Sequence, residues 1–215
     1  MYDKKFICKD DLNLKMWYAC KGVCENENFC EEVIFTKGGK SMKKLEDYVR
    51  TIPDFPEPGI MFRDVTSVLQ DAEGFKLAID SLLKLLDGVD FDIIAGAESR
   101  GFIFGAPLAY ALGKPFVLVR KKGKLPCETV SMAYELEYGS AEIEMHSDSI
   151  KPGQKVVLVD DLIATGGTIE ASAKLVEKLG GEVVKIIFLM ELAGLKGRQK
   201  LSKYDVEAVL TYEGK

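Results

Sequence analysis

Short, continuous runs of apolar residues alternate with helical patterns from about residue 42 onward, and this alternation restricts the folds open to the chain. The runs are rich in Val, Ile and Leu, and we expect each to be a buried strand: residues 91–95, 115–119, 156–159, 183–189 and 206–210. Such strands are typical of a parallel sheet that helices cover on both faces, because neither face then meets water. Ligands of these folds bind beyond the carboxyl ends of the strands, so we expect the loops there to carry the chemistry.

Helical patterns fill the intervals between these runs. Apolar residues recur with the spacing of one face of an amphipathic helix at Phe75, Ile79, Leu82, Leu83 and Leu86. Two further helices are expected over residues 101–112, where Gly113 ends the pattern, and over residues 168–179. Residues 43–50 also have helical spacing, and residues 141–145 alternate as one arm of a hairpin would. Together the patterns predict an α/β fold with a central, mostly parallel sheet.

Length and composition are those of a globular protein that can bury a sizeable core. The chain has 215 residues, of which 47% are hydrophobic and 29% charged, and its net charge is −5. A negative net charge argues against broad binding to nucleic acid. No apolar run approaches the roughly 18 residues that span a membrane, and Asp10 and Asp11 interrupt the start of the chain before the apolar stretch of a signal peptide can form. We therefore expect a cytoplasmic protein with no membrane and no nucleic-acid partner.

Residues 1–41 differ in character from the rest of the chain. They hold four of the five cysteines and the only tryptophan, Trp17, and they carry no net charge. The spacing of these cysteines lacks the paired C-x2-C of a strong zinc motif, so free thiols are the main expectation and a zinc site is the alternative. A Gly-Gly-Lys-Ser joint ends the segment. We expect two parts, an atypical and dispensable Cys-containing extension over residues 1–41 and the functional domain over residues 42–215.

The most informative stretch runs from Val156 to Thr168 and reads V-V-L-V-D-D-L-I-A-T-G-G-T. A buried strand ends in two carboxylates, Asp160 and Asp161, and a Gly-rich turn then begins a helix. Glycines let the backbone approach a ligand closely, and the free N–H groups of a helix start favour an anion. Adjacent carboxylates repel a bare phosphate, but they accept hydrogen bonds from the vicinal hydroxyls of a ribose. A phosphorylated ribose therefore fits the whole loop, and the plain alternative is a strand–helix turn capped by Asp.

This stretch resembles the phosphoribosyl-diphosphate loop of the type I phosphoribosyltransferases, and two rival phosphate motifs, G-x-x-x-x-G-K-[ST] and G-x-G-x-x-G, are absent from the sequence. Four further segments, in the family's order along the chain, narrow the resemblance to members that use adenine. They are residues 52–64, 98–102, 120–126 and 134–139. The resemblance extends from about Met42 to Glu213, and residues 1–41 have no counterpart in it.

The resemblance implies a fold, a reaction and a moving part. The fold is that of the type I phosphoribosyltransferases, with helices on both faces of the sheet and a mobile lid (hood) over the carboxyl ends of the strands. Residues 122–140 suit that lid, because they contain two glycines and a proline and few helix signals. The reaction, part of purine salvage, joins N9 of adenine to C1′ of 5-phosphoribosyl 1-diphosphate. It gives AMP and pyrophosphate through an oxocarbenium-like transition state.

The resemblance also implies a cofactor and an assembly. Mg²⁺ would bridge ribose and diphosphate oxygens while keeping few protein ligands, so no metal-binding residues are assigned. In the family, an arginine at the position of Arg120 reaches into the neighbouring subunit's site, which implies a homodimer. The family often has a cis peptide bond at the position of Glu98–Ser99.

Individual residues receive roles from the same resemblance. Phosphoribosyl diphosphate is expected to bind Ser99, Arg100, Arg120, Lys121, Lys124, Tyr138, Asp160, Asp161, Ala164, Thr165, Gly166, Gly167 and Thr168. Adenine is expected to bind Met61, Phe62, Arg63 and Leu162, between the side chains of Phe62 and Leu162 and against backbone groups near the other two. The expected catalytic residues are Glu137, Asp160, Asp161 and Arg100. The two aspartates would hold the ribose hydroxyls, and Glu137 would hydrogen-bond N7 of adenine and ease loss of the N9 proton.

Two other functions stay open. A regulator that senses phosphoribosyl diphosphate would keep the loop and lack catalysis. It would also need a nucleic-acid-binding element, and residues 1–41 show neither a helix-turn-helix pattern nor excess basic charge. A phosphoribosyltransferase for 6-oxopurines is the second alternative, because recognition of a base by the main chain leaves only a faint trace in the sequence.

Overall fold

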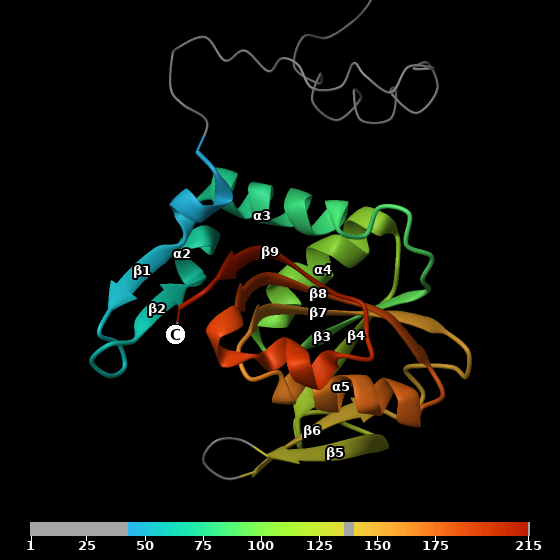
Figure 1. Ribbon diagram of the computed structural model, residues 1–215. Coiled ribbons are helices and arrows are strands. Elements are labelled where there is room, and N and C mark those ends of the chain that lie inside the picture. Colours follow the sequence, from blue (N-terminus) through green and yellow to red (C-terminus); the bar gives the residue numbers. More distant parts are fainter. Residues whose placement is uncertain (1–42, 136–139, 215) are drawn as a thin grey trace, which may run out of the picture. The chain divides into compact units, whose positions relative to one another are not determined.

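The computed structural model of the protein describes residues 43–135 and 140–214 (Figure 1). The centre of this described part is a seven-stranded sheet in the order β5-β6-β4-β3-β7-β8-β9. Its strands are β3 (Ile93–Ala97), β4 (Phe116–Lys121), β5 (Thr129–Glu135), β6 (Ser140–His146), β7 (Lys155–Ile163), β8 (Glu182–Leu192) and β9 (Val206–Tyr212). Strands β4, β3, β7, β8 and β9 run parallel, and β6 and β5 continue the sheet in antiparallel pairing. The predicted α/β architecture is confirmed.

Helices cover both faces of this sheet (Figure 1). Helices α3 (Ala72–Lys84) and α4 (Arg100–Leu112) lie on one face, and α5 (Gly167–Lys178) lies on the other. Along β7, Val157 and Val159 belong to the core beneath α3 and α4, whereas Val156 and Leu158 belong to the core beneath α5. Because alternate side chains of one strand meet apolar partners on opposite faces, the strand has to be apolar throughout. This packing explains the continuous runs in the sequence.

Local signals set the ends of the helices. Asp71 caps α3, since its side chain accepts hydrogen bonds from the backbone N–H groups of Glu73 and Gly74 at 2.9 and 3.1 Å. Helix α4 ends at Gly113, whose φ of +62° lies in the left-handed region that favours glycine. The structure confirms the helices predicted over residues 101–112 and 168–179, and each begins a residue earlier than predicted.

A separate hairpin precedes the sheet and corrects one prediction. Strands β1 (Arg50–Pro53) and β2 (Met61–Asp64) pair antiparallel, and the short helix α2 (Thr66–Leu69) follows them. The helix predicted over residues 43–50 is wrong, because the structure has only a 3-10 turn, Leu45–Tyr48, before the chain becomes extended. The apolar spacing there reflects tertiary packing of this short turn against the core, which overrides local helix propensity.

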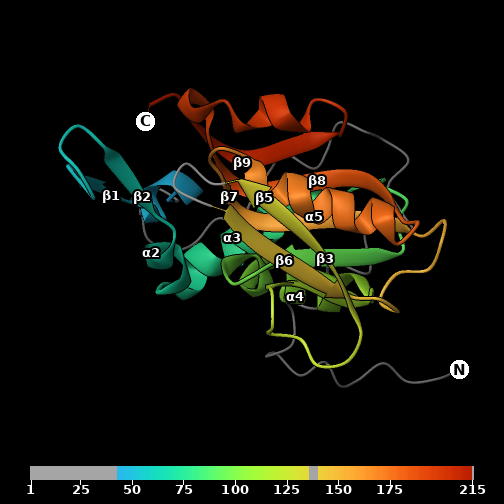
Figure 2. The same ribbon diagram turned by 90° about the horizontal axis from the view of Figure 1, so that it is seen from below.

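The stretch predicted as a lid is in part a strand. Within residues 122–140, β5 pairs with β6 along its whole length and lies beside α5 (Figure 2). The strand predicted over residues 91–95 lies two residues later, at β3. The segment predicted as a dispensable extension, with its alternative zinc site, and the candidates Glu137 and Tyr138 lie outside the described residues. In the described ranges, no helix has the length and apolar character needed to cross a membrane.

Candidate active site

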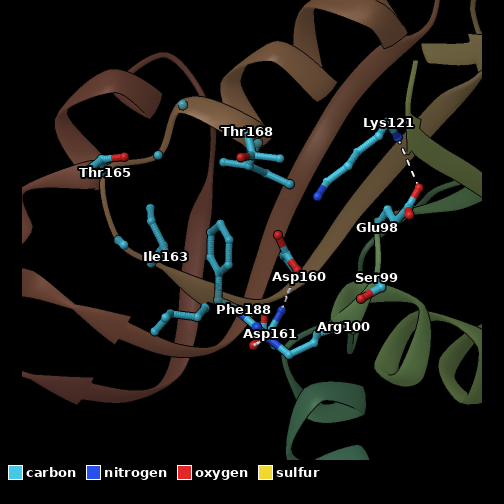
Figure 3. A pocket seen from close by; sticks show the side chains of 15 residues that line it. Glu98, Ser99, Arg100, Lys121, Asp160, Asp161, Ile163, Thr165, Thr168 and Phe188 are labelled. Carbon is cyan, nitrogen blue, oxygen red and sulfur yellow. Dashed lines mark hydrogen bonds and ion pairs between the residues drawn. The ribbon is translucent and has the colours of Figure 1, made fainter. Parts of the chain in front are cut away.

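The carboxyl ends of three neighbouring strands open onto one cleft of about 360 Å³ (Figure 3). Strand β3 leads through a short turn into α4, β4 ends at Lys121, and β7 leads through a Gly-rich loop into α5. Pairing between β3 and β7 stops at Gly96 opposite Val159, whereas β7 stays paired with β8 as far as Ile163. The cleft therefore opens at the point where β3 ends and β7 continues, as expected for a parallel α/β sheet.

Most of the residues predicted to bind phosphoribosyl diphosphate come together in this cleft. It is lined by Ser99, Arg100, Lys121, Asp160, Asp161, Leu162 and residues 164–168. Among the described residues, the other predicted ones lie outside its lining, namely Arg120, Lys124, Met61, Phe62 and Arg63. The predicted turn at Glu98–Ser99 has a cis peptide bond and forms part of the lining.

The two adjacent carboxylates have different surroundings. Asp161 is only 3% exposed and forms an ion pair with Arg100, at the start of α4. Asp160 points into the cleft between Thr168 and Lys121 (Figure 3), and its Oδ1 accepts the backbone N–H of Asp161 at 2.9 Å. Burial and the neighbouring Asp161 carboxylate raise the pKa of Asp160 well above its ordinary value. One carboxylate is thus compensated by a cation, and the other faces the open space of the cleft.

A close approach of helix to strand makes the Arg100–Asp161 pair possible. A Cβ atom on Gly101 would lie 2.8 Å from the carbonyl oxygen of Val159 and 3.0 Å from Oδ1 of Asp160. Only glycine lets the first turn of α4 approach the end of β7 so closely. The sequence signal for this contact is the glycine that follows Ser99 and Arg100 in the E-S-R-G-F segment.

The loop between β7 and α5 has the form expected of an anion site. Gly166 has a φ of +77°, and α5 begins at the next residue. The N–H of Glu170 bonds back to the carbonyl of Gly166 at 3.0 Å, so the N–H groups of residues 167–169 precede the first bond of the helix and face outward from its start. Thr165 and Thr168 add hydroxyl groups to the lining. A phosphate at this point would meet the positive end of the α5 dipole.

The turn that follows β8, at Gly197, packs directly against this loop. A Cβ atom on Gly197 would lie 2.2 Å from the carbonyl oxygen of Ala164, and one on Gly166 would lie 2.6 Å from the carbonyl oxygen of Gly197. Two glycines therefore face each other across a contact that admits no side chain. Sequence reasoning missed Gly197, although the G-L-K-G-R string at residues 194–198 is a turn signal.

The cations of the site divide into two groups. Arg100 and Lys121 line the cleft. Arg120 instead contacts its own chain, through its Nε to the Glu98 carboxylate at 3.0 Å and through its Nη1 to the Lys124 carbonyl at 3.0 Å. The positive charge available inside the cleft therefore comes from the first group.

The predicted adenine residues lie on two separate elements. Met61, Phe62 and Arg63 belong to strand β2 of the hairpin, and the first two side chains are 42% and 39% exposed. Phe62 contacts the ring of Phe55 edge to face, with 5.1 Å between ring centroids. Leu162 belongs to β7 and lines the cleft. An exposed aromatic ring and a cleft-lining leucine are available to a base, but they do not share one cavity in this structure.

Several lining residues had no assigned role in the sequence. Ile163, Ile169 and Phe188 give the cleft an apolar side, and the Glu98 carboxylate lies at its rim. Phe188 lies in a continuous apolar strand, Ile163 ends β7 and Ile169 lies on the apolar face of α5, so in sequence all three look like ordinary core residues. Glu98 belongs to one of the segments that carry the family resemblance, and the available clue was an acidic residue in a turn between Gly96 and Gly101.

This combination of a parallel sheet, a Gly-rich loop at a helix start and paired carboxylates is matched by a known family. The model of the family described as phosphoribosyl transferase domain matches residues 65–212, and the chain belongs to this family.

Named relatives narrow the comparison. The adenine phosphoribosyltransferase of Butyrivibrio fibrisolvens is 80% identical over 174 residues, which cover 81% of this chain and 96% of the relative. That of Agathobacter rectalis is 76% identical over 174 residues, which cover 81% of this chain and all of the relative. The crystal structure of adenine phosphoribosyltransferase from Thermoanaerobacter pseudethanolicus matches with a TM-score of 0.75 and 57% identity, covering 79% of this chain and all of that one.

Proposed function

We propose that this protein is an enzyme of purine salvage that transfers the phosphoribosyl group of 5-phosphoribosyl 1-diphosphate to adenine. The observation that carries the proposal is the cleft, in which paired carboxylates stand directly before a Gly-rich helix start. Relatives of high identity that bear the name of this activity support the choice of adenine. In the reaction, the bond from C1′ to the diphosphate oxygen breaks, and its electron pair leaves with pyrophosphate. A bond from C1′ to N9 of adenine forms, and N9 loses its proton.

The carboxylates and the loop would hold the sugar. Asp160 and Asp161 accept hydrogen bonds from the two ribose hydroxyls, while residues 164–168 surround the 5′-phosphate. Because C1′ becomes cation-like before the new bond forms, the negative charge of Asp160 also stabilises the transition state. Holding the sugar at both ends fixes C1′ in line between the leaving oxygen and the attacking nitrogen.

The diphosphate would lie against Ser99, Arg100 and Lys121, which line the opposite side of the cleft. The described residues contain no cluster of three or more His, Cys, Asp or Glu able to hold a metal ion. Asp160 and Asp161 would be the carboxylates that hold a Mg²⁺ ion arriving with the substrate, and such an ion would keep most of its waters. When bound, Mg²⁺ would neutralise part of the diphosphate charge. We also propose a homodimer in which Arg120 reaches into the neighbouring subunit's site, and Lys124, in the loop after β4, adds a further cation for the diphosphate.

Adenine would stack on Phe62 and contact Leu162, with the backbone near Met61 and Arg63 at its edge. The exposure of Phe62 supports this role, because a ring on the free side of a hairpin can stack on a flat base. We propose that the hairpin and the cleft close on the ligand, so that Phe62 and Leu162 meet opposite faces of one base. Glu137 and Tyr138 are proposed to complete the closed site, in the cytoplasm where we place the enzyme.

One experiment tests the substrate. We expect AMP formation with adenine and phosphoribosyl diphosphate, and far slower turnover with hypoxanthine, guanine and xanthine measured in parallel. Faster turnover with a 6-oxopurine would assign the protein to that alternative. No turnover with any base, together with a nucleic-acid gel shift that depends on phosphoribosyl diphosphate, would identify a regulator. A protein with Asp90→Asn, which alters an exposed ion pair with Lys155, serves as an unaffected control.

A further inference from the structure

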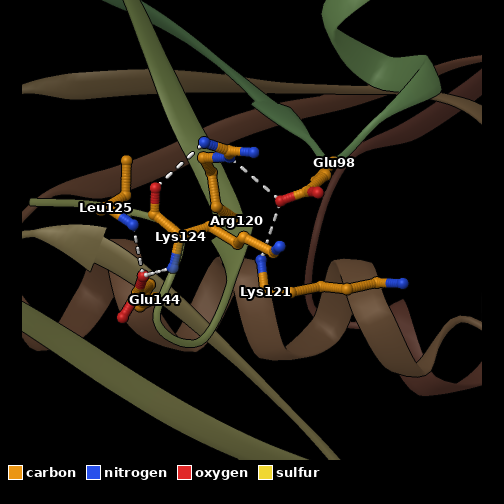
Figure 4. Close-up of polar contacts among 6 residues, drawn as sticks. All are labelled: Glu98, Arg120, Lys121, Lys124, Leu125 and Glu144. Atoms are coloured by element: carbon orange, nitrogen blue, oxygen red, sulfur yellow. Dashed lines mark hydrogen bonds and ion pairs between the residues drawn. The ribbon is translucent and has the colours of Figure 1, made fainter.

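Glu144, on the middle strand β6 of the antiparallel part of the sheet, is a buried acid whose role lies outside the cleft. Its side chain is 3% exposed. Its Oε1 accepts the backbone N–H groups of Lys124 and Leu125, each at 2.8 Å (Figure 4). A buried carboxylate is costly unless such donors compensate it. Burial raises the pKa of Glu144, but the N–H groups of Leu125, Gly123 and Lys124 outweigh burial and lower it below its ordinary value.

The same loop is held from its other side by Arg120. Arg120 lies directly opposite Glu144 in the pairing of β4 with β6. Its Nη1 donates to the carbonyl of Lys124 at 3.0 Å, so the backbone of Lys124 is bound at its N–H by Glu144 and at its C=O by Arg120 (Figure 4). These contacts fix the course of the chain just after β4 ends.

The contacts continue from Arg120 to the edge of the cleft. The Glu98 carboxylate accepts hydrogen bonds from Nε of Arg120 at 3.0 Å and from the backbone N–H of Lys121 at 3.1 Å (Figure 4). Glu98 and Lys121 both line the cleft. A series of hydrogen bonds therefore leads from the buried Glu144 through the backbone of Lys124, Arg120 and Glu98 to the backbone N–H of Lys121, a residue that lines the cleft.

We infer that Glu144 is a positioning residue that orders the loop after β4 and thereby, through Arg120 and Glu98, sets Lys121 for binding the diphosphate group. This inference rests on the proposed function, because it takes diphosphate as the ligand beside Lys121. Glu144 itself does not line the cleft, so it acts only through the loop. Removing it leaves the N–H groups of Lys124 and Leu125 without their acceptor and releases one side of the loop.

Three substitutions of Glu144 distinguish the effect of side-chain length from the effect of charge. Glu144→Gln keeps an oxygen where Oε1 stands, so both N–H groups retain an acceptor. Glu144→Asp keeps the charge but shortens the side chain by a methylene group, and Glu144→Ala removes the acceptor. We expect Ala and Asp to raise KM for phosphoribosyl diphosphate and Ki for pyrophosphate about tenfold, and Gln to change them less than about twofold. KM for adenine should change less than about twofold in all three.

Glu142 offers a matched control on the same strand. Its partly exposed carboxylate contacts the side chains of Lys122 at 2.8 Å and Ser131 at 2.6 Å, and it accepts no backbone N–H of the 123–125 loop in the described part of the chain. Glu142→Ala should leave both diphosphate constants at the wild-type value. If Glu142→Ala raised KM for phosphoribosyl diphosphate and Ki for pyrophosphate as much as Glu144→Ala does, any acid on β6 would have the same effect, and the inference would be overturned.

The other possible outcomes of these experiments also support or contradict the inference. If the Ala variant does not fold, the Asp and Gln variants still test the inference. It predicts that the neutral Gln variant keeps KM and Ki near the wild-type values and that the charged Asp variant does not. Unchanged constants for Asp, or parallel changes in the constants for adenine, would contradict it. If the wild-type protein makes no AMP, the proposed function fails, and calorimetric binding of pyrophosphate to the same variants still tests Glu144. Absence of pyrophosphate binding to the wild type would overturn both.

Discussion

Two neighbouring aspartates that look alike in the sequence are distinguished by a single cation. Arg100 lies against Asp161, and the cleft leaves Asp160 free to meet a ligand. Under the proposed function, the pair would hold the two ribose hydroxyl groups without placing two uncompensated charges side by side. The pKa of Asp160 stays raised because its carboxylate is buried and because it is repelled by the carboxylate of Asp161.

We predict that Asp160→Asn and Asp161→Asn each lose most of their turnover. Each change removes a charged hydrogen-bond acceptor for a ribose hydroxyl, which is worth about 1.5–3 kcal/mol, or roughly 10- to 150-fold in kcat/KM if it is realised in the transition state. Steady-state rates of AMP formation measure the loss, with Asp90→Asn as the surface control. Turnover near the wild-type value in both variants would sink the ribose assignment.

The raised pKa of Asp160 predicts how stability depends on pH. Between the ordinary value of 3.8 and its raised folded-state pKa, Asp160 keeps a proton in the folded protein that it has lost in the unfolded chain. Folding therefore takes up a proton, and the free energy of unfolding falls as pH rises through this window. Asn at position 160 has no such penalty and keeps an oxygen for the N–H of Asp161.

Ligand-free Asp160→Asn protein should thus unfold at a higher temperature than the wild type at pH 8, and the difference should shrink as pH falls toward about 4. Thermal unfolding across this range, without substrate, measures it. A Tm difference that is independent of pH would show that Asp160 has an ordinary pKa.

At the scale of elements, the loop between β7 and α5 depends on the turn that follows β8. Gly197 meets the carbonyl of Ala164 so closely that an added Cβ atom would lie at 2.2 Å, whereas one on Gly214 would meet no atom within 4 Å. We predict that Gly197→Ala displaces the loop, raises KM for phosphoribosyl diphosphate at least about tenfold and lowers stability by about 1–3 kcal/mol. Gly214→Ala is the control.

Kinetics and thermal unfolding of both variants decide between two explanations. If Gly197→Ala lost stability but kept its KM, the turn would support the fold without shaping the loop between β7 and α5. If Gly214→Ala raised KM by the same factor, the close contact at Gly197 would not be the cause of the effect.

The elements that build the cleft were the ones predicted best. Strands β3, β4, β7 and β8 are apolar on both faces, so their sequences leave little choice of structure. Strand β5 was missed because glycine and proline nearby favoured a loop, although Val130, Met132 and Tyr134 alternate along it and pack against the core. The helix predicted over residues 43–50 was wrong for another reason, because tertiary packing decided the structure of the short turn Leu45–Tyr48.

Across the whole molecule, sequence reasoning predicted which residues line the cleft wherever sheet topology alone brings them together. Ser99, Lys121 and Asp160 lie at or near the carboxyl ends of three parallel strands, so their meeting at one edge follows from the sheet. Phe62 is different, because no rule of sheet topology places a separate hairpin relative to the cleft. Phe188 was not predicted, because a cleft-lining side chain on a buried strand looks the same in sequence as any core residue.

The last prediction concerns the first 41 residues, whose composition differs from the rest. We predict that a chain shortened to begin at Met42 folds, forms AMP and assembles as the full-length protein does. All site residues proposed above belong to residues 42–215. In addition, the relative from Agathobacter rectalis is matched over its entire length by 174 residues, 81% of this chain, so it lacks a counterpart to about a fifth of it.

Three measurements on the full-length and shortened proteins test this: Tm, association state and turnover, each with and without a zinc chelator. The chelator tests the alternative that the clustered cysteines bind zinc, since a structural zinc site contributes folding free energy that chelation removes. Apolar side chains of the segment could also pack on the domain, each contributing about 1.5–3 kcal/mol. If truncation costs more than about 3 kcal/mol, or if chelation unfolds only the full-length form, the segment is structural and the prediction is wrong. Equal Tm and equal turnover would show that residues 42–215 are sufficient for the proposed activity.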